Sequence, residues 1–262
     1  MKKVAIILAL IFALLLSSCG EIPSSGNTGS ENNAGNTVTT GENSKESTDS
    51  TKEEIKTDIK ADSLDELEDL VIKEVDKSVA SLTEKYEQLK NDIDTYEKYK
   101  TNTDKIEEFY NDVYVSHHTL TLKLREYALS YAEIILSSDN SIDDKYDELE
   151  ELYDNVYDDA GEDVYDEIYD GILEEIYDFY YDGILDKAYD TVPYKEWSDL
   201  RSDEYDWWSD TRSDVYDDWS DFRSDVYDFW SDMRSELWDD DIDKAMEKKE
   251  DFKDDITKLK DK

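Results

Sequence analysis

Four arginines recur at intervals of eleven residues among tryptophans and tyrosines in the last third of the chain. In the first unit Trp197, Arg201 and Tyr205 are four residues apart, so on a helix the guanidinium lies against both rings. Cation–π attraction of this kind is worth roughly 0.5–2 kcal/mol. The aromatic ladder consists of these three residues and their equivalents: Trp208, Arg212, Tyr216, Trp219, Arg223, Tyr227, Trp230, Arg234 and Trp238.

The ladder arginines have few acidic partners on their own helix. Only Arg201 has an acid three residues later, at Glu204, and none of the four has one at i−4, i−3 or i+4. We therefore expect carboxylates of the preceding Tyr-Asp segment, or of a second subunit, to pair with them. The ladder is then either an aromatic packing seam or an exposed surface that stacks on the sugar rings of cell-wall or host glycans.

Metal ligation has weak support in the sequence. Oxygen-bearing residues fall at positions 1, 3, 5, 9 and 12 of a loop similar to an EF-hand, but the glycine needed at position 6 is Asp144. The segment is equally well a helix cap at Ser141. We predict no dedicated metal site and no cofactor, only weak and diffuse calcium binding by acidic faces. The weak candidates for the loop are Asp139, Ser141, Asp143, Asp147 and Glu150.

Enzyme chemistry has no recognisable constellation. His117 and His118 are the only histidines, and we expect His117 to occupy a helix core position instead of ligating a metal. No glycine-rich phosphate loop, activated nucleophile or distinct carboxylate pair stands out from the 71 acidic residues. The sequence predicts a protein that is not an enzyme.

Composition favours long helices and excludes one class of partner. The net charge is −42, which repels nucleic acid and anionic lipid headgroups. Only 8 glycines and 2 prolines are present, which leaves little material for turns. We expect an all-α fold.

The segment 53–138 predicts an antiparallel helical hairpin. Its apolar residues step alternately by three and four, the 3.5-residue period of a heptad seam, on either side of a polar break at 101–103. The expected seams are Ile72, Val75, Val79, Leu82, Tyr86, Leu89, Ile93 and Tyr96, then Ile106, Tyr110, Val113, His117, Leu120, Leu124, Tyr127, Tyr131 and Ile134.

The segment 139–190 is a Tyr-Asp repeat built from blocks of four residues, which also recur in threes. Four residues advance about 400° on an α-helix, so the apolar stripe rotates about 40° per block. We therefore expect either several partners around this helix or a bend or break near Gly161, Gly171 and Gly183.

The segment 191–262 carries the eleven-residue, or hendecad, repeat, which drifts only about 20° per unit. We expect one helix that continues through Ala245 to about Lys260, about 100 Å in all. The predicted fold is thus a heptad hairpin followed by two long repeat-built helices, in an extended bundle or coiled coil.

The N-terminus carries a targeting signal. Lys2 and Lys3 precede an apolar run that ends before Ser17, Ser18 and Cys19, a pattern too short for a membrane span. The small residues before Cys19 resemble the lipobox of bacterial lipoproteins. That resemblance implies removal of residues 1–18 and acylation of the Cys19 thiol. The polar segment 19–52 would be a disordered tether.

This resemblance implies a protein anchored by lipid on the extracytoplasmic face of the cell membrane. We expect a structural or protein-interaction role for an acidic, elongated helical bundle. The alternative is a glycan- or cation-binding surface module, and a third interpretation is a hydration or stress-protective polymer. Expected partners are the membrane, a cell-envelope protein or glycan, and a second copy of the chain, but not nucleic acid.

Overall fold

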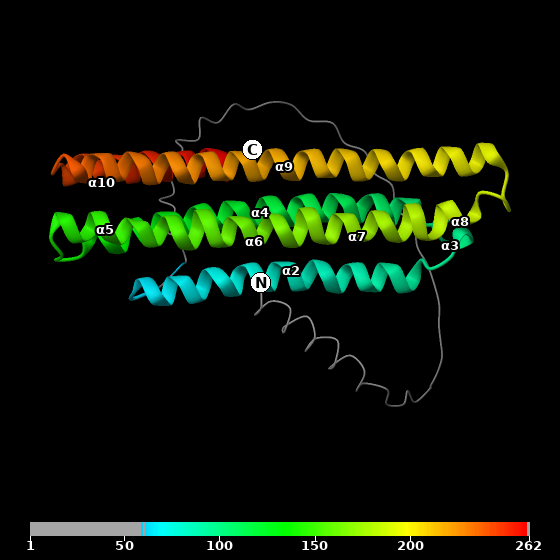
Figure 1. Ribbon diagram of the computed structural model, residues 1–262, viewed down its shortest axis with the longest axis horizontal. Helices are drawn as coiled ribbons and strands as arrows, with labels where there is room; N and C mark the ends of the chain where they lie inside the picture. The colour runs from blue at the N-terminus through cyan, green and yellow to red at the C-terminus, as the bar shows by residue number, and fades with distance from the viewer. Residues whose placement is uncertain (1–58, 60, 261–262) are drawn as a thin grey trace, which may run out of the picture. The chain divides into compact units, whose positions relative to one another are not determined.

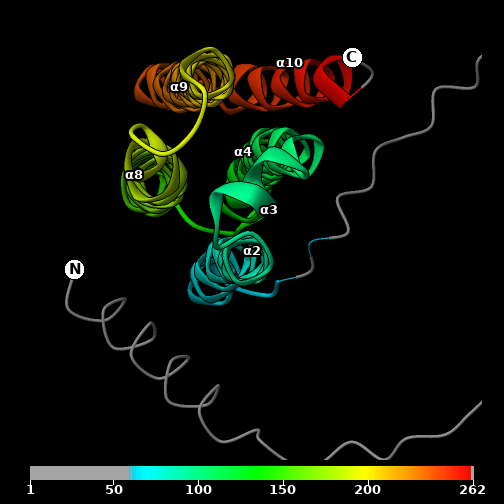
Figure 2. The ribbon, with the colours of Figure 1, turned by 90° about the vertical axis from the view of Figure 1, so that its right-hand side faces the viewer.

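The computed structural model describes residue 59 and residues 61–260, which belong to one compact unit, Glu53–Lys262. The expected signal and tether lie outside the described residues. Within them every element is helical and no strand is present, so the predicted all-α bundle is confirmed. Five long helical segments lie side by side (Figures 1 and 2): α2 (Leu64–Asp92), α4 (Thr103–Ser137), the segment from α5 to α8, α9 (Tyr194–Trp238) and α10 (Ile242–Lys260).

The predicted hairpin is formed by α2 and α4, which pack against each other. Ser63 caps α2, its hydroxyl accepting from the Glu66 amide at 3.2 Å. The first helix is shorter than expected: α2 ends at Asp92, and the separate α3 (Tyr96–Lys100) follows before the break.

The first seam also differs from the prediction at its start, where Val71 and not Ile72 faces the core. Ile72 is 49% exposed, whereas Val71 is buried together with Leu67 and Val75. Because α2 also packs against the Tyr-Asp segment, its buried face there follows a spacing of four.

The second helix of the hairpin is the centre of the bundle. α4 packs against α2, α5, α9 and α10, and it lies among them in the end-on view (Figure 2). Its expected seam is buried from Ile106 to Tyr131, and Ile134 is partly buried. Surrounding helices also bury residues off the seam, including Leu129, Ala132 and Ile135.

The Tyr-Asp helix, residues 142–188, is one continuous helix in which α and π turns alternate. Of the two expected alternatives, the bend or break does not occur, and the helix instead packs against several partners, α2, α4 and α9. The order is α5 (Ile142–Leu152), η1 (Tyr153–Ala160), α6 (Gly161–Val164), η2 (Tyr165–Ile172), α7 (Leu173–Tyr177), η3 (Asp178–Leu185) and α8 (Asp186–Ala188), where η denotes a π-helix. Residues at every junction keep helical φ and ψ.

The π turns correct the mismatch between a four-residue repeat and an α-helix. A π turn closes i→i+5 hydrogen bonds, so mixing it with α turns raises the mean to about four residues per turn. The apolar stripe then stays on one face without rotating. Its buried members are spaced by four: Leu152, Val156, Ala160, Val164, Ile168, Ile172, Ile176, Tyr180, Ile184 and Ala188.

Gly161 allows α9 to pack closely against the Tyr-Asp helix and does not bend that helix. A Cβ at this position would stand 3.3 Å from Cε1 of Phe222 on α9. The Gly161 carbonyl also accepts a hydrogen bond from Nε1 of Trp219 at 2.9 Å. The absent side chain therefore makes room for α9.

The single helix expected for 191–262 is wrong, because the chain reverses after Trp238. Asp240 has a φ of 58°, the left-handed conformation that ends a helix. Asp241 stands here at the position that holds tryptophan in the preceding units, so the aromatic ladder ends at Trp238. α10 then returns against α9 and α4, and the rings of Phe252 and Phe229 stack at 4.0 Å. A continuous helix would leave Phe252 and Ile256 in water.

Candidate functional site

The Tyr-Asp helix and α9 interlock with unequal repeats, twelve residues on the former and eleven on the latter. The two helices run antiparallel (Figure 1), and each repeat spans three turns. Eleven α-helical residues cover about 16 Å, and the π turns let twelve residues cover the same length. The register is visible in the ring contacts Tyr153–Trp230 at 4.7 Å, Tyr165–Trp219 at 4.5 Å, Tyr177–Trp208 at 4.5 Å and Tyr189–Trp197 at 4.7 Å.

Three of these contacts involve a pair of stacked tyrosines on the Tyr-Asp helix. On an α-helix, side chains four residues apart differ by about 40° around the axis. The π turns remove most of that offset, so the two rings of each pair lie nearly parallel. The pairs are Tyr153–Tyr157 at 4.7 Å and 26°, Tyr165–Tyr169 at 4.6 Å and 22°, and Tyr177–Tyr181 at 4.5 Å and 21°.

Each ladder arginine lies between two aromatic rings. One is a tyrosine of the Tyr-Asp helix, and the other is the α9 tryptophan that precedes the arginine by four residues. The guanidinium of Arg201 is 4.2 Å from the Tyr181 ring and 5.1 Å from the Trp197 ring. The equivalent contacts are Arg212 with Tyr169 and Trp208, Arg223 with Tyr157 and Trp219, and Arg234 with Tyr146 and Trp230, all between 4.2 and 5.1 Å.

Carboxylates from the Tyr-Asp helix complete three of these four sites. Arg201 pairs with Asp186 at 3.2 Å and Arg234 with Glu150 at 3.1 Å. Arg212 pairs with Glu174 and lies 4.0 Å from Asp170. The expected pairing is confirmed for these three arginines. Arg223 makes its ring contacts with no ion pair among the residues that the structure describes.

The ladder has a buried side and an exposed side. Trp197 is buried, Trp208, Trp219 and Trp230 are partly buried, and the tilted tyrosines of α9 point outward. The exposed members are Tyr205 at 47%, Tyr216 at 44%, Tyr227 at 43% and Trp238 at 75%. Tryptophan and arginine form a packing seam, and the α9 tyrosines form a row on its outer edge.

The EF-hand-like segment forms the turn between α4 and α5 and the first part of α5, and two of its candidate ligands already have protein partners. Ser141 caps α5, accepting from the Asp144 amide at 3.2 Å, and Glu150 pairs with Arg234. Asp139, Asp143 and Asp147 belong to no cluster of three or more metal-ligating side chains among the described residues. The positive charge at this corner is the buried Lys145 ammonium, which donates to the Ile135 and Leu136 carbonyls at 3.0 Å. A cation at the C-terminus of α4 stabilises its free carbonyls.

His117 and His118 meet an aspartate that the sequence analysis did not single out. Asp218 on α9 accepts from Nδ1 of His117 at 2.8 Å, from Nδ1 of His118 at 2.7 Å and from the Thr121 hydroxyl at 2.8 Å. Burial alone raises the pKa of Asp218, but these hydrogen bonds outweigh it and lower the pKa to about 2. The repeat gave only a partial signal, since the equivalent positions hold Trp207 and Phe229 in the two neighbouring units but Asp240 in the last.

Glu204 is a second departure from the repeat, at a position that holds Val215, Val226 and Leu237 in the other units. It does not pair with Arg201. Its side chain is fully buried and accepts from the hydroxyls of Tyr99 and Tyr110, both at 2.7 Å. Burial raises the pKa of Glu204 to about 7, although the two hydrogen bonds oppose the shift.

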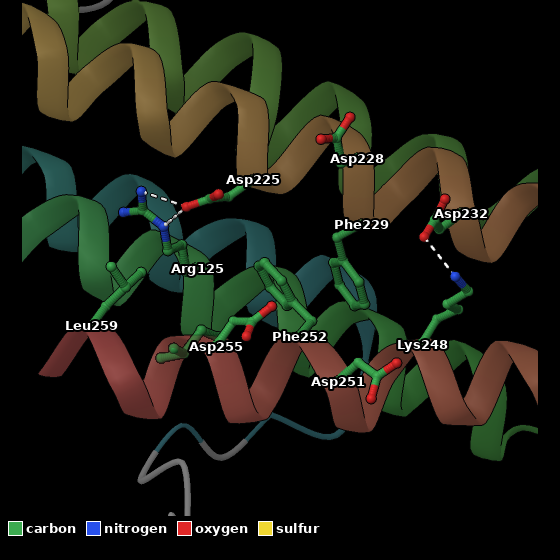
Figure 3. Close-up of a pocket in the computed structure, with 11 residues that line it drawn as sticks. Arg125, Asp225, Asp228, Phe229, Asp232, Lys248, Asp251, Phe252, Asp255 and Leu259 are labelled. Atoms are coloured by element: carbon green, nitrogen blue, oxygen red, sulfur yellow. Dashed lines mark hydrogen bonds and ion pairs between the residues drawn. The ribbon is translucent and has the colours of Figure 1, made fainter. Parts of the chain in front are cut away.

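A cavity of about 330 Å³ opens between α9 and α10 (Figure 3). Arg125 of α4 is buried at one end, with Nε and Nη2 both 2.9 Å from Asp225, and its Nη1 has no hydrogen-bond partner. Lys248 pairs with Asp232 at the other end at 2.9 Å. Five of the eleven lining residues are aspartates, and the stacked rings of Phe229 and Phe252 lie between the two ends.

Among the residues that the structure describes, no helix combines the length and apolar character needed to cross a membrane. In comparisons with protein-family models, curated proteins and solved structures, nothing matches this chain. We therefore infer the function from the arrangement of the ladder, from the buried polar pairs and from the signal expected from the N-terminal sequence.

Proposed function

We propose that this chain is a lipid-anchored protein of the bacterial cell surface with a structural or protein-interaction role. The single observation that carries the interaction role is the exposed tyrosine row of α9, formed by Tyr205, Tyr216 and Tyr227 at intervals of eleven residues. Each ring leans on the neighbouring tryptophan at 5.6–5.8 Å, which restricts its motion. Tyrosines held in this way bind partners at low entropic cost, and tyrosine is enriched at protein interfaces.

The polar groups inside the bundle support a role without catalysis. Three ladder arginines pair with carboxylates, both histidines donate to Asp218, and Glu204 accepts from two tyrosines. These groups hold helices together, so they are engaged in the fold. The outer surface offers chiefly acids and the tyrosine row to a partner.

The anchor is tested at Cys19. We expect Cys19→Ser to release the protein from the membrane fraction, or to leave it as an unprocessed precursor, because the variant lacks the thiol that would be acylated. Fractionation and mass measurement of the recovered chain distinguish the two results. A cleaved variant that stays in the membrane fraction as the wild type does would contradict the lipoprotein assignment.

The tyrosine row is tested by the triple variant Tyr205→Ser/Tyr216→Ser/Tyr227→Ser. We expect chemical cross-linking to envelope proteins on intact cells to fall at least tenfold, because the variant lacks the exposed rings. The matched control is Ser202→Ala/Ser213→Ala/Ser224→Ala, which changes exposed residues of the same helix at the same spacing. Equal loss in both variants, or no loss in either, would count against this surface.

A second candidate function, glycan binding, is favoured by the same exposed rings, because sugars stack on tyrosine faces. Sedimentation of the purified protein with isolated cell-wall glycan separates the two functions. Binding to glycan that the tyrosine variant abolishes would replace the protein-interaction proposal.

A further inference from the structure

The three stacked tyrosine pairs have a geometry suited to a covalent reaction. In each pair the centroids are 4.5–4.7 Å apart and the planes differ by 21–26°. The first tyrosine of each pair also lies 4.5–4.7 Å from a tryptophan of α9. The pairs repeat every twelve residues, so the same arrangement is built three times.

One-electron oxidation of a phenol gives, after loss of its proton, a phenoxyl radical with spin density on the ortho carbons. Two such radicals couple by forming a bond between ortho carbons, and each ring then loses the hydrogen at that carbon to recover its phenol. With a peroxide as oxidant the balance is two tyrosines plus H2O2 giving one dityrosine and two H2O. Two rings held in contact react at a high effective concentration.

We propose that Tyr153–Tyr157, Tyr165–Tyr169 and Tyr177–Tyr181 are sites of oxidative coupling to intramolecular dityrosine by a peroxide-derived one-electron oxidant. The chain has a single cysteine, so it cannot form an internal disulfide. Each coupling closes a covalent ring over a π turn and holds the Tyr-Asp helix in the winding that keeps its register with α9.

The first tyrosine of each pair keeps its phenol proton until oxidation. Burial raises the pKa of Tyr153, Tyr165 and Tyr177, and the stacked partner tyrosine and the charges of Asp158, Asp170 and Asp182 raise it further. These three hydroxyls are therefore protonated at neutral pH, and each enters the reaction as a phenol.

The geometry also predicts which tyrosines do not couple within the chain. The Tyr157–Tyr227 and Tyr169–Tyr216 contacts are longer, at 5.8 and 6.1 Å, and tilted by 51° and 50°. The tyrosines of α9 are more exposed to an oxidant but lack a stacked tyrosine partner. Selectivity for the stacked pairs therefore distinguishes a built site from simple accessibility.

The test uses the full chain carrying Cys19→Ser, so that no thiol competes, oxidised in dilute solution with light, ruthenium(II) tris-bipyridine and persulfate. An aspartate follows the first tyrosine of each pair, at Asp154, Asp166 and Asp178, so cleavage before aspartate separates uncoupled partners. We expect three joined peptide pairs, each lighter by two hydrogens, from a chain that remains monomeric.

Tyr169→Phe should remove only the product of the central pair, because phenylalanine keeps the ring that contacts Arg212 but has no phenol. Tyr216→Phe, a more exposed tyrosine nearby, should leave all three products. In denaturant we expect the yield to fall at least tenfold. Equal yield in denaturant, coupling confined to the α9 tyrosines or to other chains, or oxidation that stops at the tryptophans would each overturn the proposal.

Discussion

Replacing Asp218 by alanine is expected to lower the free energy of unfolding by about 3–5 kcal/mol, a large fraction of the stability of a typical domain. The carboxylate accepts from His117, His118 and Thr121, and its own side chain is only 10% exposed. Its removal leaves Nδ1 of the fully buried His117 without its acceptor, and a buried unpaired donor is costly, whereas the Thr121 hydroxyl can still donate to the His118 carbonyl at 3.0 Å. Chemical denaturation of the two proteins at neutral pH measures the difference.

The adjacent Asp217 provides the control, because it is exposed and belongs to the acidic face of α9. Asp217→Ala removes the same charge and should change stability by less than about 0.5 kcal/mol. Similar values for Asp217→Ala and Asp218→Ala would show that net charge, and not the histidine contacts, determines the effect.

Asp218 also predicts an acid-sensitive term in stability. Its folded pKa of about 2 lies below the ordinary value of 3.8, so its contribution is present above pH 4 and is lost as the pH falls toward 2. Asp218→Ala should lack that term, which makes its stability flatter than that of wild type over this range.

The parts of the fold that could be predicted are those in which a repeat period matches the α-helix. The seam of α4 has the heptad period and is buried almost as expected, from Ile106 to Tyr131. The buried face of α2 was less predictable, because the start of this helix packs on the Tyr-Asp helix as well as on α4. The second contact buries Val71 and leaves Ile72 exposed. The spacing of apolar residues in one helix does not reveal how many other helices pack against it.

The Tyr-Asp helix shows how a correct observation left two interpretations open. The four-residue period and the twelve-residue recurrence are both in the sequence, and on an α-helix they allow either several partners or a bend near Gly161, Gly171 and Gly183. The helix has several partners, α2, α4 and α9, and its π turns keep the stripe on one face, which the α-helical geometry did not predict. Because of the π turns, a twelve-residue repeat on this helix matches the length of an eleven-residue repeat on α9, and the contact between Tyr165 and Trp219 shows this register.

The buried polar groups left a signal that the sequence analysis did not use. Glu204 interrupts a repeat position that is apolar in the other three units, and Asp218 stands at a position that holds an aromatic residue in the two neighbouring units. An exception of this kind indicates a local partner, since an unpaired charge in a core is costly. The partners themselves could not be inferred, because Tyr99, Tyr110 and His117 are about 100 residues away in the chain.

Glu204 gives the last prediction, a loss of stability as the pH rises. Its folded pKa of about 7 exceeds the ordinary value of 4.5, so the folded state holds a proton that the unfolded state has already released. The stabilisation is complete below pH 4.5 and is lost as the pH rises through 7. The two values correspond to about 3 kcal/mol of stability lost from this group between pH 4 and pH 8.

The variant Glu204→Gln separates the contribution of the Glu204 charge from the rest of the pH dependence of stability. The amide resembles the protonated carboxyl, since it offers one acceptor and one donor group to Tyr99 and Tyr110. We expect the variant to match wild type at pH 4 and to exceed its stability by about 3 kcal/mol at pH 8, because the buried negative charge is absent. Denaturation at both pH values measures this, with Asp203→Asn as an exposed control on the same helix. If wild type and Glu204→Gln follow parallel curves from pH 4 to pH 8, Glu204 does not titrate in the core, and its tyrosine partners alone determine its contribution.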